Sequence, residues 1–132
     1  MTHEEAFAKA FLPSEKRARF IQQLADPKKR PDMLAQLDSK LPCLPRFATV
    51  MPGEQDFPGE LEKLLKAKGA GPTCYVIAHG LKADRRELPL REALNLVCMH
   101  ELGVILSCLP GRLAYYKPEA PRPGILLEHL PD

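Results

Sequence analysis

The sequence predicts a single α+β domain, in which short N-terminal helices pack on a small mixed sheet that contains one βαβ unit and a C-terminal hairpin. The length of 132 residues is that of one ordinary domain. Apolar residues recur at helical spacing before residue 40, and an apolar strand, helix and strand follow one another over residues 73–109. With 45% hydrophobic and 27% charged residues, the composition is that of a globular protein rather than a disordered chain.

The first third of the chain predicts three short helices that are separated by prolines. Thr2 and Glu5 fit a capping box at the start of the first helix, Ser14 is the expected N-cap of the second, and Asp26–Pro27 precedes the third. Helices this short are unstable alone, so we expect them to pack together. Their apolar positions are Phe7, Ala10 and Phe11, then Phe20, Ile21 and Leu24, then Met33, Leu34 and Leu37.

Residues 41–58 contain four prolines and no clear periodicity, which predicts a long connection with a short strand at 46–51. A helix should follow. Asp56 is its expected cap, and Gly69 its expected end. Leu61, Leu64 and Leu65 form its apolar stripe.

Residues 73–109 predict the βαβ unit. A strand at 73–78 precedes a charged loop at 80–87, a helix that opens at Pro89, and a second strand at 104–109. A right-handed crossover would make the two strands parallel, with their carboxyl ends at one sheet edge. Pro110–Gly111 then forms a turn into a third strand at 113–116. We place the domain boundary after residue 117 and expect 118–132 to form a proline-rich tail, whose cluster at 125–127 can dock as an edge strand.

A parallel βαβ unit would bring His79 and Cys108 to the edge where open α/β sheets bind ligands. A cysteine thiolate activated by histidine is a nucleophile, so the pair is a candidate catalytic site. The simpler interpretation, which we prefer, is that Cys108 is a packed thiol and His79 begins a solvated loop. The binding residues expected around this edge are Arg112, Ser107, Lys82 and Asp84.

A cluster of basic residues lies in the second and third predicted helices. Such a cluster can contact a nucleic-acid phosphate backbone. However, few aromatic residues accompany the charges, and the net charge of the chain is only +2. A solvated helix face is therefore the preferred interpretation. The cluster consists of Lys16, Arg17, Arg19, Lys28, Lys29 and Arg30.

Signatures of metal and cofactor binding are missing from the sequence. The four histidines and four cysteines show no zinc-ligand spacing, and no glycine-rich phosphate loop or GxSxG motif occurs. We therefore expect no metal and no cofactor. No apolar run is long enough to cross a membrane, and the acidic N-terminus does not resemble a secretion signal, so we expect a cytoplasmic protein with reduced thiols.

The sequence thus favours a small, non-catalytic binding or regulatory module that acts through contacts with an unidentified protein partner. Two alternatives stay open. The first is a nucleic-acid-associated protein that uses the basic helices at 14–30. The second is a small enzyme with a Cys/His site at the sheet edge.

Overall fold

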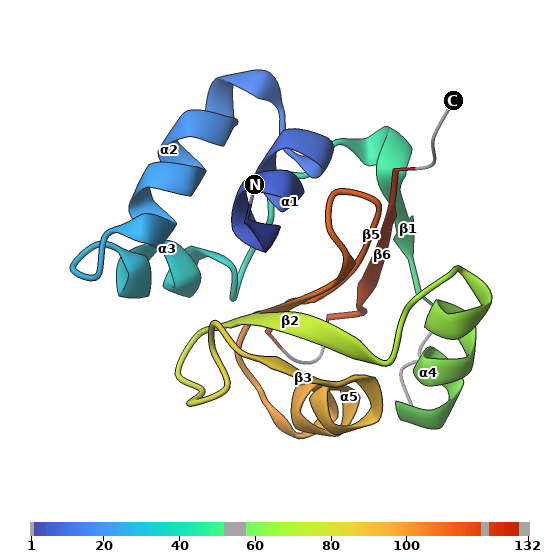
Figure 1. Ribbon diagram of the computed structural model, residues 1–132. Helices are drawn as coiled ribbons and strands as arrows, with labels where there is room; N and C mark the ends of the chain where they lie inside the picture. Colours follow the sequence, from blue (N-terminus) through green and yellow to red (C-terminus); the bar gives the residue numbers. More distant parts are fainter. Residues whose placement is uncertain (1, 52–57, 120–121, 130–132) are drawn as a thin grey trace.

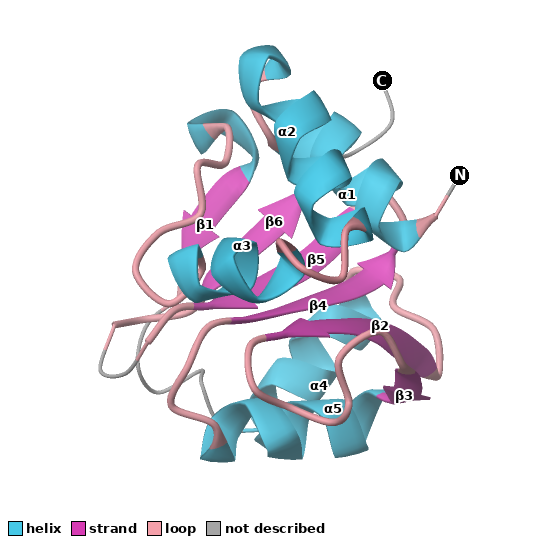
Figure 2. Ribbon diagram, turned by 90° about the vertical axis from the view of Figure 1, so that its left-hand side faces the viewer, coloured by secondary structure: helices cyan, strands magenta, loops and turns pink. Residues whose placement is uncertain are grey.

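A computed structural model describes residues 2–51, 58–119 and 122–129. Its centre is a six-stranded antiparallel sheet with helices on both faces (Figures 1 and 2). Helices α1 to α3 cover one face and α4 and α5 cover the other, so the fold has three layers. The predicted α+β class is therefore confirmed, as is the packing of the N-terminal helices on the sheet.

The helices are α1 (His3–Phe11), α2 (Ser14–Ala25), α3 (Arg30–Gln36), α4 (Pro58–Ala67) and α5 (Leu90–Met99), with a 3-10 turn at Pro45–Phe47. The strands are β1 (Ala48–Val50), β2 (Thr73–Ala78), β3 (Glu87–Pro89), β4 (Val104–Leu109), β5 (Leu113–Lys117) and β6 (Ile125–Glu128).

The helix starts follow the sequence signals in part. The hydroxyl of Thr2 accepts a hydrogen bond of 3.1 Å from the backbone N–H of Glu5, so the predicted cap of α1 is confirmed. Ser14 is instead the first residue of α2, because Pro13 occupies the N-cap position and provides no side-chain bond. The predicted cap Asp56 lies outside the described residues.

The sheet has the order β1-β6-β5-β4-β2-β3. The predicted parallel βαβ unit is wrong, because β2 pairs with β4 in antiparallel fashion, with Tyr75 opposite Ser107 and Ala78 opposite Val104. Part of the predicted loop forms the short strand β3, which pairs antiparallel with β2 and reverses the chain before α5 begins. Helix α5 therefore joins β3 to β4, two parallel strands with β2 between them, which is a split βαβ arrangement.

The C-terminal half completes the sheet. The predicted hairpin is confirmed, since β4 and β5 pair antiparallel around a turn in which Gly111 has a φ of 71°. The segment that we expected to be a tail contributes β6, which pairs with β5 on one side and β1 on the other. The cluster at 125–127 is thus an inner strand rather than an edge strand, because β1 covers its outer side.

The sheet separates two apolar cores. Residues of β4 alternate between them: Leu106 and Cys108 face α4 and α5, whereas Ile105 faces α1 to α3. Within the described ranges, no helix has the length and apolar character that crossing a bilayer requires.

Candidate binding site

His79 and Cys108 do not share a cleft. Because β2 and β4 are antiparallel, His79 lies beside Gly103 at the start of β4, where its N–H donates to the Gly103 carbonyl at 3.4 Å. Cys108 lies near the other end of β4 and is only 6% exposed. A hydrogen bond with Cys74, burial and the proximity of the Cys74 thiol together raise the pKa of Cys108, so its reactive thiolate is disfavoured. The hypothesis of a Cys/His site at one sheet edge is therefore wrong, and Cys108 is a packed thiol.

The four predicted binding residues are divided in the same way. Lys82 and Asp84 lie in the β2–β3 loop, at the end of the sheet where His79 is found. Arg112 is exposed on the turn between β4 and β5, and Ser107 is buried within β4. They do not form one binding surface.

Asp84 and Ser107 nevertheless belong to one network of polar side chains beneath α1, which we call the α1 network. Its other members are His3, Glu4, Arg30, Tyr75 and Glu87. At one end of this α1 network, Arg30 is 5% exposed and contacts Asp84 at 2.7 and 2.8 Å and Glu4 at 2.8 and 3.0 Å. It also donates to the Leu24 carbonyl at 3.0 Å. Burial alone would lower the pKa of Arg30, but hydrogen bonds to Asp84 and Glu4 and their charges raise it above its ordinary value. The guanidinium is therefore fully engaged within the fold.

The other end of the α1 network reaches Ser107. Tyr75 donates to Glu4 at 3.0 Å, and the ring of His3 stacks on Tyr75 with centroids 4.9 Å apart. Nδ1 of His3 lies 2.8 Å from the Ser107 hydroxyl, and its Nε2 lies 3.3 Å from Glu87. The order Ser–His–Glu resembles that of a catalytic triad, but Ser107 is 1% exposed and no substrate could reach it. The α1 network thus fixes α1 to the sheet.

His79 lines a cavity of about 480 Å³ between α3 and the β2–β3 loop. Its Nδ1 lies 3.1 Å from Asp38, whose second oxygen accepts the N–H of Gly103 at 2.7 Å. The charged residues of this cavity are mostly engaged already, because Arg30 pairs with Asp84 and Arg85 donates to the Leu24 carbonyl. The cavity therefore has no strong preference for a charged ligand.

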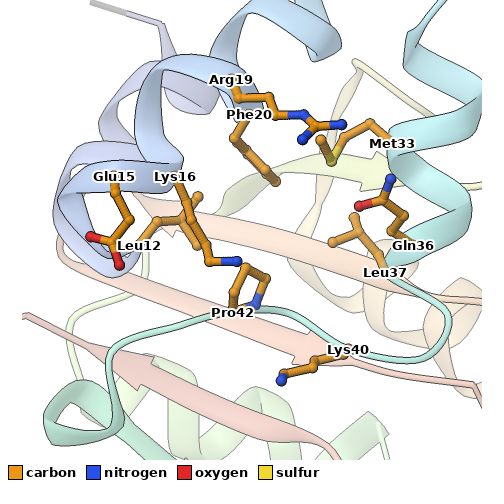
Figure 3. Close-up of a pocket in the computed structure, with 10 residues that line it drawn as sticks. All are labelled: Leu12, Glu15, Lys16, Arg19, Phe20, Met33, Gln36, Leu37, Lys40 and Pro42. Carbon is orange, nitrogen blue, oxygen red and sulfur yellow. The ribbon is translucent and has the colours of Figure 1, made fainter.

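A second hollow is the better candidate. The groove between α2 and α3 has a volume of about 330 Å³ and is shown in Figure 3. Side chains from both helices and from the segment after α3 enclose it, and an adjoining space of about 410 Å³ extends it past Pro42 to Pro13 and Cys43. We call the two hollows together the α2–α3 groove, since Lys16, Gln36, Lys40 and Pro42 line both of them. Its apolar floor consists of Leu12, Phe20, Met33 and Leu37.

The rim of the α2–α3 groove is basic. Lys16 and Arg19 extend from α2, and Lys40 extends from the segment that follows α3 (Figure 3). All three are exposed, and Glu15 is the one acidic residue of the lining. Three positive charges therefore face one negative charge around an apolar floor.

The structure divides the basic cluster of the sequence. Lys16 and Arg19 lie on the α2–α3 groove, while Lys28 and Lys29 are exposed on the connection between the two helices. Arg17 donates to the Leu12 carbonyl at 2.9 Å. Arg30 cannot contact a phosphate backbone, because it is buried in the α1 network. Sequence reasoning missed Lys40, which joins the groove only through the tertiary fold.

Metal binding has no evident site in the described part of the chain, where no three His, Cys, Asp or Glu side chains gather closely enough to hold an ion.

Comparisons of the chain with models of protein families, with curated proteins and with solved structures found no match.

Proposed function

We propose that the protein is a non-catalytic binding module of the cytoplasm that holds an acidic segment of a protein partner in the α2–α3 groove. The observation that carries this proposal is the combination of an apolar floor with a rim on which three cations face a single carboxylate.

The basic rim is the first argument for an acidic partner. The excess of positive charge attracts carboxylates over distances of about 10 Å at moderate salt. The guanidinium of Arg19 can hold a carboxylate through two parallel hydrogen bonds, whereas Lys16 and Lys40 act as mobile point charges. Electrostatic complementarity of this kind favours rapid association and discriminates against basic segments.

The apolar floor is the argument for one apolar side chain within that acidic segment, which would anchor it in the groove. Phe20 and Leu37 are 3% and 1% exposed, so the floor presents the edges of side chains that the helices already hold in place. A rigid floor of this kind needs no reordering when a partner binds, and interface energy is commonly concentrated in one or two anchors that enter such hollows. We therefore expect one large apolar side chain, flanked by aspartate or glutamate.

The lining supports binding rather than catalysis. Its lysines, arginine and glutamine offer charge and hydrogen bonds. The one thiol, Cys43, lies in the extension towards Pro13, and burial raises its pKa, so it is protonated at neutral pH.

The test is fluorescence anisotropy with a labelled synthetic peptide in which glutamates flank a single leucine. We expect saturable binding that weakens as salt is added. The double variant R19E/K40E should bind at least about tenfold more weakly, because both substitutions place a carboxylate on the rim. Peptides with alanine for leucine, or with lysine for glutamate, should also bind more weakly.

The matched control is K28E/K29E, which makes the same change of charge on exposed residues outside the lining. It should leave the affinity within about twofold of the starting protein. Equal losses in the two double variants would mean unspecific attraction and would overturn the proposal. So would a labelled DNA duplex that binds more tightly than the peptide and displaces it, since that result would favour the nucleic-acid alternative.

A further inference from the structure

Two buried cysteines face each other across the strands β2 and β4. Tyr75 and Ser107 are the last paired residues of β2 and β4, and Cys74 and Cys108 occupy the next position of each strand. The register of β4 against β5 shifts between Ser107 and Leu109, so Cys108 lies at a β-bulge. Both side chains lie in the core beneath α4 and α5, where they are 1% and 6% exposed. Cys74 is the neighbour that raises the pKa of Cys108, through a hydrogen bond and through its charge. The two side chains are therefore neighbours in the same core.

The hydrogen bonds of the sheet identify the kind of pair that these cysteines form. The backbone N–H of His79 donates to the Gly103 carbonyl across the same two strands, which is one of the two hydrogen bonds that mark a hydrogen-bonded pair. Bonded and non-bonded pairs alternate along an antiparallel ladder, so continuing this alternation for five positions gives Cys74 and Cys108 the phase of a non-hydrogen-bonded pair. The hydrogen bonds of Val76 are consistent with this alternation. Its N–H donates to the Arg86 carbonyl and its carbonyl accepts from the Arg85 N–H, so both point away from β4.

A non-hydrogen-bonded pair has the right dimensions for a covalent link. Its Cα atoms lie about 4.5 Å apart, and disulfides span about 4.4 to 6.8 Å between Cα atoms. A Cα separation in this range allows a disulfide to form between neighbouring strands.

We infer that Cys74 and Cys108 are a site of reversible oxidation, at which a disulfide-bearing oxidant such as oxidised glutathione converts the two thiols into a cross-strand disulfide. One cysteine thiolate attacks a sulfur of the oxidant, forms a mixed disulfide and releases one glutathione thiolate. The second cysteine thiolate then attacks the protein sulfur of the mixed disulfide and releases the second glutathione thiolate. The two cysteine protons end on the two glutathiones, so two thiols are oxidised and one disulfide is reduced.

The burial of the pair determines the rate of this exchange. Because the pKa of Cys108 is raised, few thiolates exist in the closed fold at neutral pH. The oxidant must gain access through an opening of the sheet, whose edge at β2 is covered by the three-residue strand β3 and by Arg85 and Arg86 of the loop before it. We therefore expect slow formation and slow reduction, and the position of equilibrium is the informative measurement.

The experiment places the full chain in buffers with a series of ratios of reduced to oxidised glutathione. The protein is added to each buffer either already folded or by dilution from urea. Each sample is then quenched with acid and analysed by intact mass and peptide mapping. The variant C43S/C98S keeps only Cys74 and Cys108. On oxidation its mass should fall by two hydrogen atoms, and its digest should contain a disulfide-linked peptide with Cys74 and Cys108. The full chain should yield the same link.

The variants C74A and C108A serve as controls, and circular dichroism checks that each is folded. Neither should form an internal link at a ratio that oxidises C43S/C98S. The inference is overturned if C43S/C98S stays reduced, or carries two separate glutathiones, both when it starts folded and when it is diluted from urea. It is also overturned if the link in the full chain joins Cys43 or Cys98.

Discussion

The guanidinium of Arg30 and the carboxylate of Asp84 meet through two hydrogen bonds of 2.7 and 2.8 Å, although 54 residues separate them in the sequence. The pair joins the start of α3 to the β2–β3 loop. Because Glu4 contacts the same guanidinium, one buried cation holds three segments of the chain together. A buried charge is tolerated only when its partners are close and its hydrogen bonds are satisfied, and both conditions are met at Arg30.

Replacing Arg30 with methionine should destabilise the protein by about 3 kcal/mol, because the half-buried carboxylates of Glu4 and Asp84 would be left without their partner. Urea unfolding followed by circular dichroism measures the change. The matched control is Lys29→Met at the adjacent exposed position, where we expect a change within about 0.5 kcal/mol. Equal effects at the two positions would contradict the structural role of Arg30.

Replacing Gly103 with alanine should destabilise the fold by about 1–3 kcal/mol through overpacking. A Cβ atom at Gly103 would lie 2.5 Å from the carbonyl oxygen of Leu37 and 2.8 Å from the backbone nitrogen of Asp38, and neither atom can move freely. The control is Gly71→Ala, because a Cβ at Gly71 would meet nothing within 4 Å. Thermal unfolding of the two variants should show a lowered Tm for the first alone.

The stability of the protein should fall as the pH rises from about 10 to 12. Burial, followed by the charge of Glu4 and the hydrogen bond to it, raises the pKa of Tyr75 to about 12, above an ordinary value of about 10. Over that range the unfolded chain loses the phenol proton and the folded chain keeps it, so the free energy of unfolding decreases.

The variant Tyr75→Phe tests this assignment. At pH 9 it should be less stable than the starting protein by about 1 kcal/mol, because the hydrogen bond to Glu4 is lost. The difference should shrink towards pH 12, as the starting protein loses the contribution of Tyr75. Urea midpoints at successive pH values measure both effects. A difference that is constant with pH would show that Tyr75 is not the titrating group.

The helices were predictable from the sequence because their signals are local. Capping residues, prolines and apolar spacing of the kind seen around Thr2 and Phe7 act within a few residues. The direction of β2 relative to β4 depends instead on the three residues of β3 and on Arg85, which adopts a positive φ of 70° in the loop before them. A non-glycine residue in that conformation gives no sequence signal, so the reversal of the chain was missed.

The candidate site was predictable only in part, for a related reason. Lys16 and Arg19 stood out as basic residues on one helix, but the apolar floor beneath them requires α3 to pack beside α2. Arg30 looked identical to its basic neighbours in the sequence, and only the tertiary partners Glu4 and Asp84 remove it from the surface. A charge pattern shows which residue types are present, whereas burial decides which of them a partner can reach.

The position of β6 has a consequence for biosynthesis. Because this strand lies between β1 and β5, residues 48–50 stay without a sheet partner until residues 125–128 have been translated and have emerged from the ribosome. The N-terminal helices can associate earlier, but the sheet can be completed only after β6 has left the ribosome. During elongation the nascent chain exposes an unpaired strand edge, the kind of surface that molecular chaperones shield.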